Sequence, residues 1–489
     1  MAPPESRREN DAHGSDDDRI GLLMSAPAIR LHEARAFKRW TPFVRPFRFG
    51  AVTVEGAFQA FVTIGVEVEG QGRATGMTAE LMPPKWFDKR VDRTPDDTVR
   101  DLKASLAHAV AQANDVTVPD TAFGHHADLH GRQLAWARGA DVTPLSASFG
   151  VAQIDKAVLD GLSKVLGASF VSVLASNAVG LDARLTPDLD QASIERRLAA
   201  LTPGRSIAIR HTVGLTDRIE GPDSLASEFD AADLHYLKIK LGGDPASDCM
   251  RLVEIADLID RRGVACRITV DANEQYDPTG LASLLALIDA EPRLKGVAAR
   301  LLFIEQPFDR RVTFERELDA RVAARSVIID EADDGYDAFP RAKDLGYRGV
   351  SSKCCKGFYK ALLNATRVAV WNAEAGETRY LVSAEDLTCQ PGLAVQQDTA
   401  FVAALGLTHV ERNGHHYVDG FGSAPEVEAE AFRSAHPSLY ARTDRVRLAV
   451  ASGRLDLSSL DGPGFASGAS PDLASLAPLE TATIQGQSA

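Results

Sequence analysis

Short apolar runs alternate with longer amphipathic stretches through the second half of the chain. From about residue 206, each run is three to five residues long and precedes a stretch with helical periodicity. Strands that alternate with helices pair in parallel, because each helix returns the chain to the starting edge of the sheet. Eight units in roughly 210 residues fit a closed (β/α)8 barrel, which takes about 200–250 residues. The runs are Ile207–Ile209, Tyr236–Lys240, Arg267–Val270, Leu301–Ile304, Ser326–Ile329, Gly349–Ser352, Arg379–Val382 and Leu407–Val410.

The part before the barrel mixes strands with helices. Residues Gly50–Glu69 are rich in Val, Phe, Thr and Ile, and turn residues at Gly56 and Gly70 predict an antiparallel meander. A polar loop with two prolines is expected at Met77–Phe87. Helical periodicity follows over Asp97–Asn114 and Val151–Leu166. We therefore predict an α/β protein, a (β/α)8 TIM-type barrel with an N-terminal α+β capping domain.

Composition suggests where these parts begin and end. Residues 1–28 are charged and lack the apolar core of a signal peptide, so we expect a disordered tail. The capping domain with its linking helix is then expected at 29–204, and the catalytic barrel at 205–422. Residues 423–489 are expected to pack back on the cap before a disordered tail, since the last 20 residues contain many Ser and Ala.

Charge and cysteine content exclude several classes of protein. The chain has 489 residues and a net charge of −14, which argues against a protein that binds nucleic-acid phosphates. No stretch approaches the roughly 20 apolar residues of a membrane span. The five cysteines lack the paired spacing of a zinc site and are typical of reduced thiols. We expect a cytoplasmic protein that binds neither nucleic acid nor membranes.

Acidic residues stand at the ends of three successive predicted strands. The third run is followed directly by Asp271, the fourth by Glu305, and the fifth by Asp330 with Glu331 beside it. The carboxyl ends of barrel strands form the face on which active sites are built. Because magnesium prefers a few carboxylates together with water and substrate oxygens, these acids predict a magnesium site.

Lysines occupy two other strands. Lys238 and Lys240 are two residues apart on the second run, so their side chains point to the same face. Two like charges near a divalent cation would lower the pKa of a lysine towards the neutral form that a general base needs. Lys353 directly follows the sixth run, across the barrel from the second.

Together these residues resemble the enolase superfamily. The motifs are Lys238-Ile-Lys240, Asp271-Ala-Asn273, Ile304-Glu-Gln-Pro307, Asp330-Glu331 and Lys353. Lysines on strands two and six are similar to the muconate-lactonising and dipeptide-epimerase branch. The mandelate-racemase branch would instead carry a histidine on strand seven, and residues 380–386 contain none. The resemblance extends over roughly residues 30 to 422, including Phe149–Gly167, which is similar to the helix that joins cap to barrel.

The resemblance implies a role for each matching residue. Asp271, Glu305 and Asp330 would bind one Mg²⁺ per active site, which Mn²⁺ could replace. Lys240 and Lys353 would form the acid/base pair. Lys238 would lower the pKa of Lys240 and contact the substrate carboxylate, and Asn273 and Glu331 would lie behind the metal ligands. The implied reaction is abstraction of the α-proton of a carboxylate substrate to give a metal-stabilised enolate.

Three functions stay open on this constellation. Racemisation or epimerisation with two lysine bases is the leading hypothesis, and a lyase (an acid-sugar or hydroxy-acid dehydratase) or a cycloisomerase is the alternative. An inactive barrel used for binding would have lost a ligand or a lysine, and none is lost. The partners expected are a small carboxylate substrate and further copies of the chain in a homo-oligomer. Candidate substrate contacts, chosen from loop and strand-end positions, are Lys85, Trp86, Arg210, His211, Glu385, Glu411 and His415.

Overall fold

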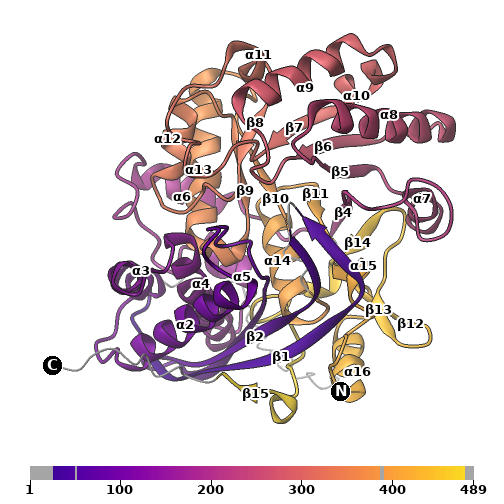
Figure 1. Cartoon of the computed structure of the whole chain (residues 1–489). Coiled ribbons are helices and arrows are strands. Elements are labelled where there is room, and N and C mark those ends of the chain that lie inside the picture. Colours follow the sequence, from indigo (N-terminus) through magenta and orange to yellow (C-terminus); the bar gives the residue numbers. More distant parts are fainter. Residues whose placement is uncertain (1–25, 50–51, 386–389, 413, 480–489) are drawn as a thin grey trace, which may run out of the picture.

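Eight parallel strands form the barrel of the protein. The computed structural model describes residues 26–49, 52–385, 390–412 and 414–479. The parallel strands pair in the order β10-β9-β8-β7-β6-β5-β4-β11, which makes a nearly closed barrel (Figure 1) and confirms the predicted fold class. They are β4 Ser206–Val213, β5 Tyr236–Lys240, β6 Arg267–Asp271, β7 Leu301–Glu305, β8 Val327–Ile329, β9 Gly349–Ser352, β10 Leu381–Ala384 and β11 His409–Glu411.

Helices follow the strands of the barrel. Helices α8 and α9 begin at aspartate caps, as when Asp244 accepts a hydrogen bond from the Ser247 amide at the start of α8. Helices α13 and α14 follow glycines and have no side-chain cap. None of the helices that the structure describes is long and apolar enough to span a membrane. The barrel helices are α7 Leu225–Ala232, α8 Pro245–Arg262, α9 Pro278–Ala290, α10 Lys295–Arg300, α11 Ala320–Ala323, α12 Ala338–Asp344, α13 Phe358–Ala375, α14 Leu393–Ala404 and α15 Gly414–Tyr417.

The cap combines an antiparallel sheet with helices, as predicted, but its strands differ from the prediction. Strand β2 (Val52–Val68) passes straight through Gly56, where a turn was expected, whereas the turn at Gly70 is present. The first part of the expected loop, up to Met82, belongs to β3 (Gly72–Met82). Strand β1 (Ile29–Phe49) was not predicted, because its many charged residues hide the alternating pattern. The cap helices are α2 Pro95–Asn114, α3 Ala122–Gly139, α4 Pro144–Val165, α5 Phe170–Ala175 and α6 Gln191–Ala199.

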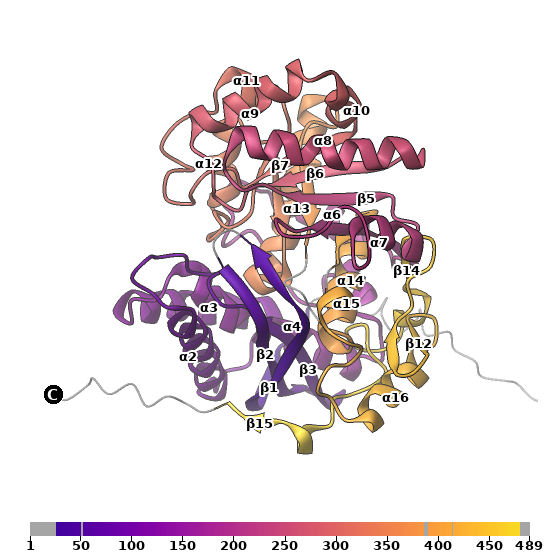
Figure 2. The same ribbon diagram turned by 45° about the vertical axis from the view of Figure 1, so that its right-hand side comes forward.

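The C-terminal segment returns to both parts of the molecule. Strand β14 (Arg454–Asp456) pairs with β4 of the barrel, and β15 (Ala477–Pro478) pairs with β1 of the cap. In Figures 1 and 2 this segment, in yellow, lies on the side of the cap away from α2 and α3. Disorder was expected for the last 20 residues, and this is wrong for residues 470–479, which the structure describes. The rest of the predicted C-terminal tail lies outside the described residues, and so does the predicted N-terminal tail except for Ala26–Ala28. The remaining elements are α16 Glu426–Ala435, β12 Tyr440–Arg442 and β13 Val446–Leu448.

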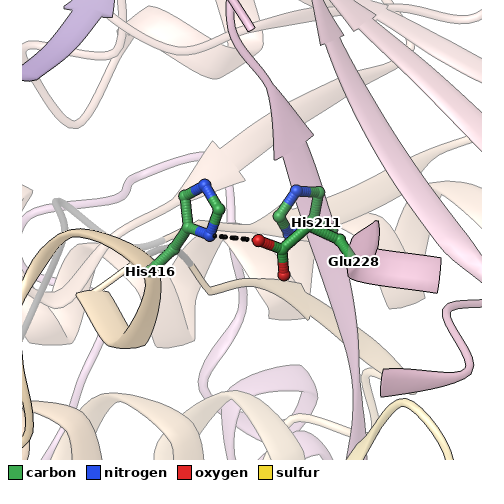
Figure 3. Close-up of side chains that lie close together, drawn as sticks. All are labelled: His211, Glu228 and His416. Atoms are coloured by element: carbon green, nitrogen blue, oxygen red, sulfur yellow. Dashed lines mark ion pairs between the residues drawn. The ribbon is translucent and has the colours of Figure 1, made fainter. Parts of the chain in front are cut away.

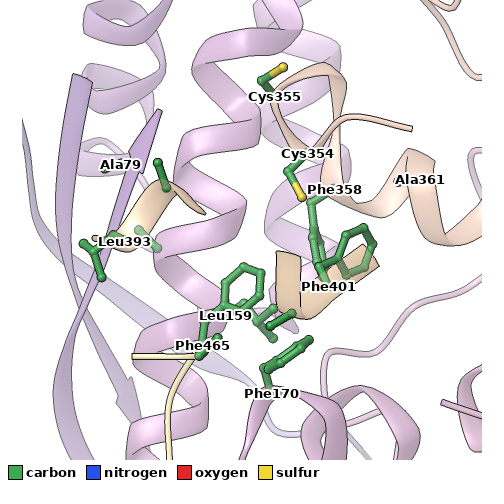
Figure 4. Packing of buried hydrophobic residues seen from close by; sticks show 14 of the residues in the cluster. Ala79, Leu159, Phe170, Cys354, Cys355, Phe358, Ala361, Leu393, Phe401 and Phe465 are labelled. Carbon is green, nitrogen blue, oxygen red and sulfur yellow. The ribbon is translucent and has the colours of Figure 1, made fainter. Parts of the chain in front are cut away.

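One hydrophobic core continues from the cap into the barrel helices. Figure 4 shows Leu159 of α4 close to Phe401 of α14, with Cys354 beside Phe358. Cys354 and Cys355 are both buried in this core, as small apolar side chains are. Because cap and barrel share this core, the loop after β3 is held against the carboxyl ends of the barrel strands.

A glycine allows the cap sheet to touch the linking helix. A Cβ at Gly76 of β3 would lie 1.8 Å from the Ala157 carbonyl oxygen of α4, which is backbone and cannot move aside. We expect Gly76→Ala to lower the free energy of unfolding by about 3 kcal/mol or more, above the usual cost of overpacking. Gly131→Ala, at an exposed position of α3, is the control, since a Cβ there meets nothing within 4 Å and should stabilise the helix by about 1 kcal/mol. Equal urea midpoints for the two variants would contradict the close contact.

Candidate active site

Acids and lysines meet at the carboxyl ends of the barrel strands. Lys238 of β5 is 1% exposed, and its ammonium stands among four carboxylates. Its Nζ lies 3.0 Å from Asp271 Oδ2, 2.8 Å from Glu305 Oε2 and 2.9 Å from Glu411 Oε2. It also contacts Glu385 Oε2. The barrel therefore buries a compact, highly charged cluster where active sites of this architecture lie.

Three acids of the cluster form a group, and Asp330 lies beside it. Asp271, Glu305 and Glu385 each offer one oxygen within 4.8 Å of the other two. Asp330 lies beside this group and is bound by two lysines: Lys353 Nζ is 2.6 Å from its Oδ2, and Lys356 Nζ is 3.1 Å from its Oδ1. The structure thus groups two of the three acids predicted to bind metal, Asp271 and Glu305, with Glu385, which was predicted only as a substrate contact, and it leaves Asp330 beside them.

Burial and charge shift the pKa values of this cluster in opposite directions. Burial and the neighbouring Glu385 raise the pKa of Glu305 well above its ordinary value. Burial alone would raise the pKa of Asp330, but Lys353 and Lys356 lower it below the ordinary range. Such a set of strongly perturbed groups in one place is typical of a functional site.

The lysines are surrounded by more negative charge than the sequence suggested. Burial would lower the pKa of Lys238, but Asp271, Glu305 and the other two carboxylates raise it well above its ordinary value. Burial would also lower the pKa of Lys353, but Asp330, Glu385 and Glu305 together raise it above its ordinary value. For Lys238 and Lys353, the protein's own groups therefore raise the pKa rather than lower it towards neutrality.

Lys240 and Lys353 lie against different acids of the cluster. Lys240 Nζ is 2.5 Å from Asp271 Oδ2, at the end of β6. Lys353, directly after β9, reaches Asp330 and lies 4.0 Å from Glu305 Oε1. Because β5 and β9 are four strands apart in the barrel order, the two ammonium groups approach the cluster from different strands.

The cap places an aromatic ring on the cluster. Trp86, in the loop after β3, is 5% exposed, and its ring centroid lies 4.9 Å from Lys353 Nζ. Arg310 of the barrel donates hydrogen bonds to the carbonyl oxygens of Trp86 (3.0 Å) and Phe87 (2.9 Å), which holds this part of the loop. The expectation that Lys85 contacts the substrate is corrected: its ammonium donates hydrogen bonds to the Arg90 and Arg93 carbonyls within the loop and does not point into the site.

A second cap residue, Lys89, was missed from the sequence. Its Nζ lies 2.7 Å from Glu274 Oε2, 3.0 Å from Glu331 Oε1 and 2.9 Å from the Asn273 carbonyl oxygen. Asn273 Nδ2 also donates to Glu331, at 3.3 Å, so these two residues are in contact. No local pattern marks Lys89, because its partners are more than 180 residues away in the chain.

The remaining predicted contacts fall on both sides of the barrel wall. Arg210 points inwards, 2.7 Å from Glu385 Oε1, and Glu411 contacts Lys238. The expectation that His211 contacts the substrate is corrected, because its ring lies next to His416 rather than among the acids of the barrel. The side chain of His415 lies outside the described residues.

A divalent cation with a preference for oxygen fits the cluster. Glu305 is 0% exposed. Apart from the ion contact between its Oε2 and the Lys238 ammonium, its two carboxylate oxygens accept no hydrogen bond from the residues that the structure describes. With Asp271 and a third acid, it supplies the small set of carboxylates with which magnesium is bound in proteins. The donor set is all oxygen, which disfavours the softer transition metals.

Comparison with known proteins identifies the fold. No protein-family model and no curated protein matches the sequence. A mandelate racemase/muconate lactonizing protein from Herpetosiphon aurantiacus matches with a TM-score of 0.58 at 16% identity, over 90% of this chain and 99% of that chain. A dipeptide epimerase from Enterococcus faecalis, complexed with Mg and the dipeptide L-Leu-L-Tyr, matches with a TM-score of 0.56 at 16% identity, over 90% and 99%.

A third solved structure leads to the same conclusion. It is an enolase from Bradyrhizobium complexed with magnesium and mandelic acid, with a TM-score of 0.57 at 17% identity over 92% of this chain and 98% of that chain. At these identities the likeness concerns the fold, and it extends over cap and barrel together. The chain has the fold of the enolase superfamily, and the resemblance predicted from its motifs is confirmed at that level.

Proposed function

We propose that the protein abstracts the α-proton of a carboxylate substrate with the help of Mg²⁺, and that the outcome is racemisation or epimerisation. The observation that carries the proposal is the pair Lys240 and Lys353, which reach one buried carboxylate cluster from strands on different sides of the barrel. Two bases on different sides of a planar enolate can remove a proton from one face and return it to the other. The dipeptide and mandelic acid complexes of proteins with this fold support the substrate class.

The metal would be held by Asp271 and Glu305 together with Asp330 or Glu385. When bound, a divalent cation supplies positive charge that stabilises the second negative charge developing on the substrate carboxylate, and it offsets the acids that otherwise keep the lysines charged. Asp271 and Glu305 are common to the sequence motif and to the spatial group of three acids. Mn²⁺, which accepts the same oxygen ligands, would replace Mg²⁺.

The remaining roles in the proposed reaction fall to the chain's own residues. Lys240 and Lys353 hold and accept protons at Nζ, and the Lys238 ammonium pairs with the substrate carboxylate. Trp86 covers Lys353 and excludes water from that side, which strengthens the electrostatic interactions inside the site. Lys89 and Arg310 tie the cap loop to the barrel, so substrate binding and loop position are linked.

A substrate panel tests the proposal. Purified protein is incubated with dipeptides and with 2-hydroxy acids, in Mg²⁺ and in EDTA, and the products are separated by chiral chromatography. We expect interconversion of stereoisomers in Mg²⁺ only, with activity restored when Mg²⁺ is returned to the chelated protein. An acid sugar with hydroxyls at C2 and C3 completes the panel, because removal of its α-proton with loss of the C3 hydroxyl as water gives a 2-keto acid. That product would indicate the dehydratase alternative, and equal turnover in EDTA would overturn the metal-dependent reaction.

The cap loop is expected to select the substrate. Trp86→Ala removes the ring over Lys353 and opens the site to water, so we expect kcat/KM for the preferred substrate to fall at least about tenfold and the order of preference to change. Trp136→Ala is the matched control, since this half-buried tryptophan of α3 stacks on His108 elsewhere in the cap. The same specificity profile in both variants, measured by competition between paired substrates, would place Trp86 outside substrate recognition.

A further inference from the structure

Two histidines and a glutamate converge at a second place in the molecule. Figure 3 shows the side chains of His211, Glu228 and His416 turned towards one another. They come from β4, α7 and α15, and each offers one ligand atom within 4.8 Å of the other two. His416 Nδ1 lies 3.0 Å from Glu228 Oε1, and the two imidazole rings meet edge to face at 5.0 Å.

This group lies behind the barrel wall and is separate from the candidate active site. Arg210 and Thr212, the neighbours of His211 on β4, point inwards and contact Glu385 and Glu411. Side chains alternate along a strand, so His211 must point to the outer face, towards the helices. The proposed reaction has no use for the group.

We propose that His211, Glu228 and His416 bind a divalent transition metal of the zinc class. Two imidazole nitrogens and one carboxylate oxygen are a ligand set that zinc accepts, whereas an all-oxygen set suits magnesium. Ligand atoms 2.0–2.2 Å from a tetrahedral zinc lie about 3.4 Å apart, so a small closure of the three side chains completes the site. The fourth position is left to water.

Burial and access suit a bound ion. His211 is 3% exposed and His416 is 8% exposed, so both rings are held by their surroundings. The Glu228 side chain keeps 20% of its surface, which gives an ion a path from solvent. The metal would join β4 to α7 and α15 and so fix the strand that carries Arg210 into the active site.

Arg45 of the cap limits the affinity of this site. Its guanidinium lies 3.0 Å from His416 Nε2, and it adds positive charge beside the ion. Coordination through Nδ1 places the remaining proton of the ring on Nε2, so the half-buried Arg45 must turn away. Removing this arginine should therefore tighten metal binding.

The test counts metal ions in the full-length protein. Chelated protein is dialysed against Zn²⁺ or Co²⁺, and bound metal is measured by elemental analysis and by the visible absorption of Co²⁺ bound to nitrogen ligands. Glu305→Gln is used as the background, so that metal in the barrel does not contribute. We expect one ion per chain in this background and none after His211→Asn or Glu228→Gln is added. His235→Gln, which removes a half-exposed histidine near Asp233, is the control and should keep the ion.

Stability gives a second readout that does not depend on activity. Zn²⁺ should raise the melting temperature of the Glu305→Gln protein by several degrees, because a ligand that binds only the folded state stabilises it. The rise should vanish in the His211→Asn variant and grow in the Arg45→Ala variant. No bound ion in the Glu305→Gln background, or an ion that survives both substitutions in the group, would overturn the proposal without affecting the function proposed for the barrel.

Discussion

Glu305→Gln should lower kcat by about a thousandfold or more, while the protein stays folded. The substitution keeps the shape of a fully buried side chain and removes the charge that holds the metal. A metal ion contributes several kcal/mol of transition-state stabilisation, and each 1.36 kcal/mol corresponds to about tenfold in rate. The same variant should no longer bind Mg²⁺ in a calorimetric titration, and its melting temperature should not fall.

The same activity and Mg²⁺-binding measurements are made on a control variant and on two variants that identify the third metal ligand. Glu254→Gln, on the exposed face of α8, should retain full activity and metal binding. Asp330→Asn and Glu385→Gln distinguish the two candidates for the third ligand, since loss of a ligand weakens Mg²⁺ binding more than loss of a neighbouring acid. If Glu305→Gln turned over substrate normally in chelator, the metal assignment would fail.

Substitution of either lysine should stop proton exchange for one enantiomer of the substrate and not for the other. In a two-base enzyme each enantiomer loses its proton to a different lysine, so Lys240→Ala should stop proton exchange with D₂O for one enantiomer and leave it for the other. Lys353→Ala should show the opposite preference. The lost reaction should fall by about 10²–10⁴-fold, the usual contribution of a general base. Net racemisation should stop in both variants.

Lys343→Ala, on α12 outside the barrel, is the control and should exchange both enantiomers at the normal rate. Complete loss of exchange in one lysine variant, with only weakened binding in the other, would indicate a one-base lyase. Full turnover in both variants would rule out the racemase and the lyase together.

The sequence contained enough information for the barrel and its central acids and lysines. Parallel strands buried on both faces appear as apolar runs, and the residue that ends each run faces the site. Asp271, Glu305 and Lys353 could therefore be placed from their positions alone. Lys238 and Lys240 follow from the two-residue repeat of a strand.

Other features depend on contacts between distant parts of the chain. Lys89 joins the site only because the cap packs on the barrel, and no local pattern reports that contact. The side chain of Glu385 points towards the group of acids, where Arg210, 175 positions earlier in the chain, donates a hydrogen bond to it. His211 was assigned to the site because it ends the same run as Arg210, although the alternation along β4 sends it outwards. Strand β1 was missed because charged residues occupy much of it.

The most direct test of the central claim follows the α-proton itself. The wild-type protein is incubated in D₂O with Mg²⁺ and a substrate from the panel, and the α-proton signal is followed by NMR. We predict that the signal disappears as solvent deuterium enters the α-carbon, that EDTA stops this loss, and that a protein lacking both Lys240 and Lys353 does not show it. Conversion of the substrate with its α-proton retained would contradict the account.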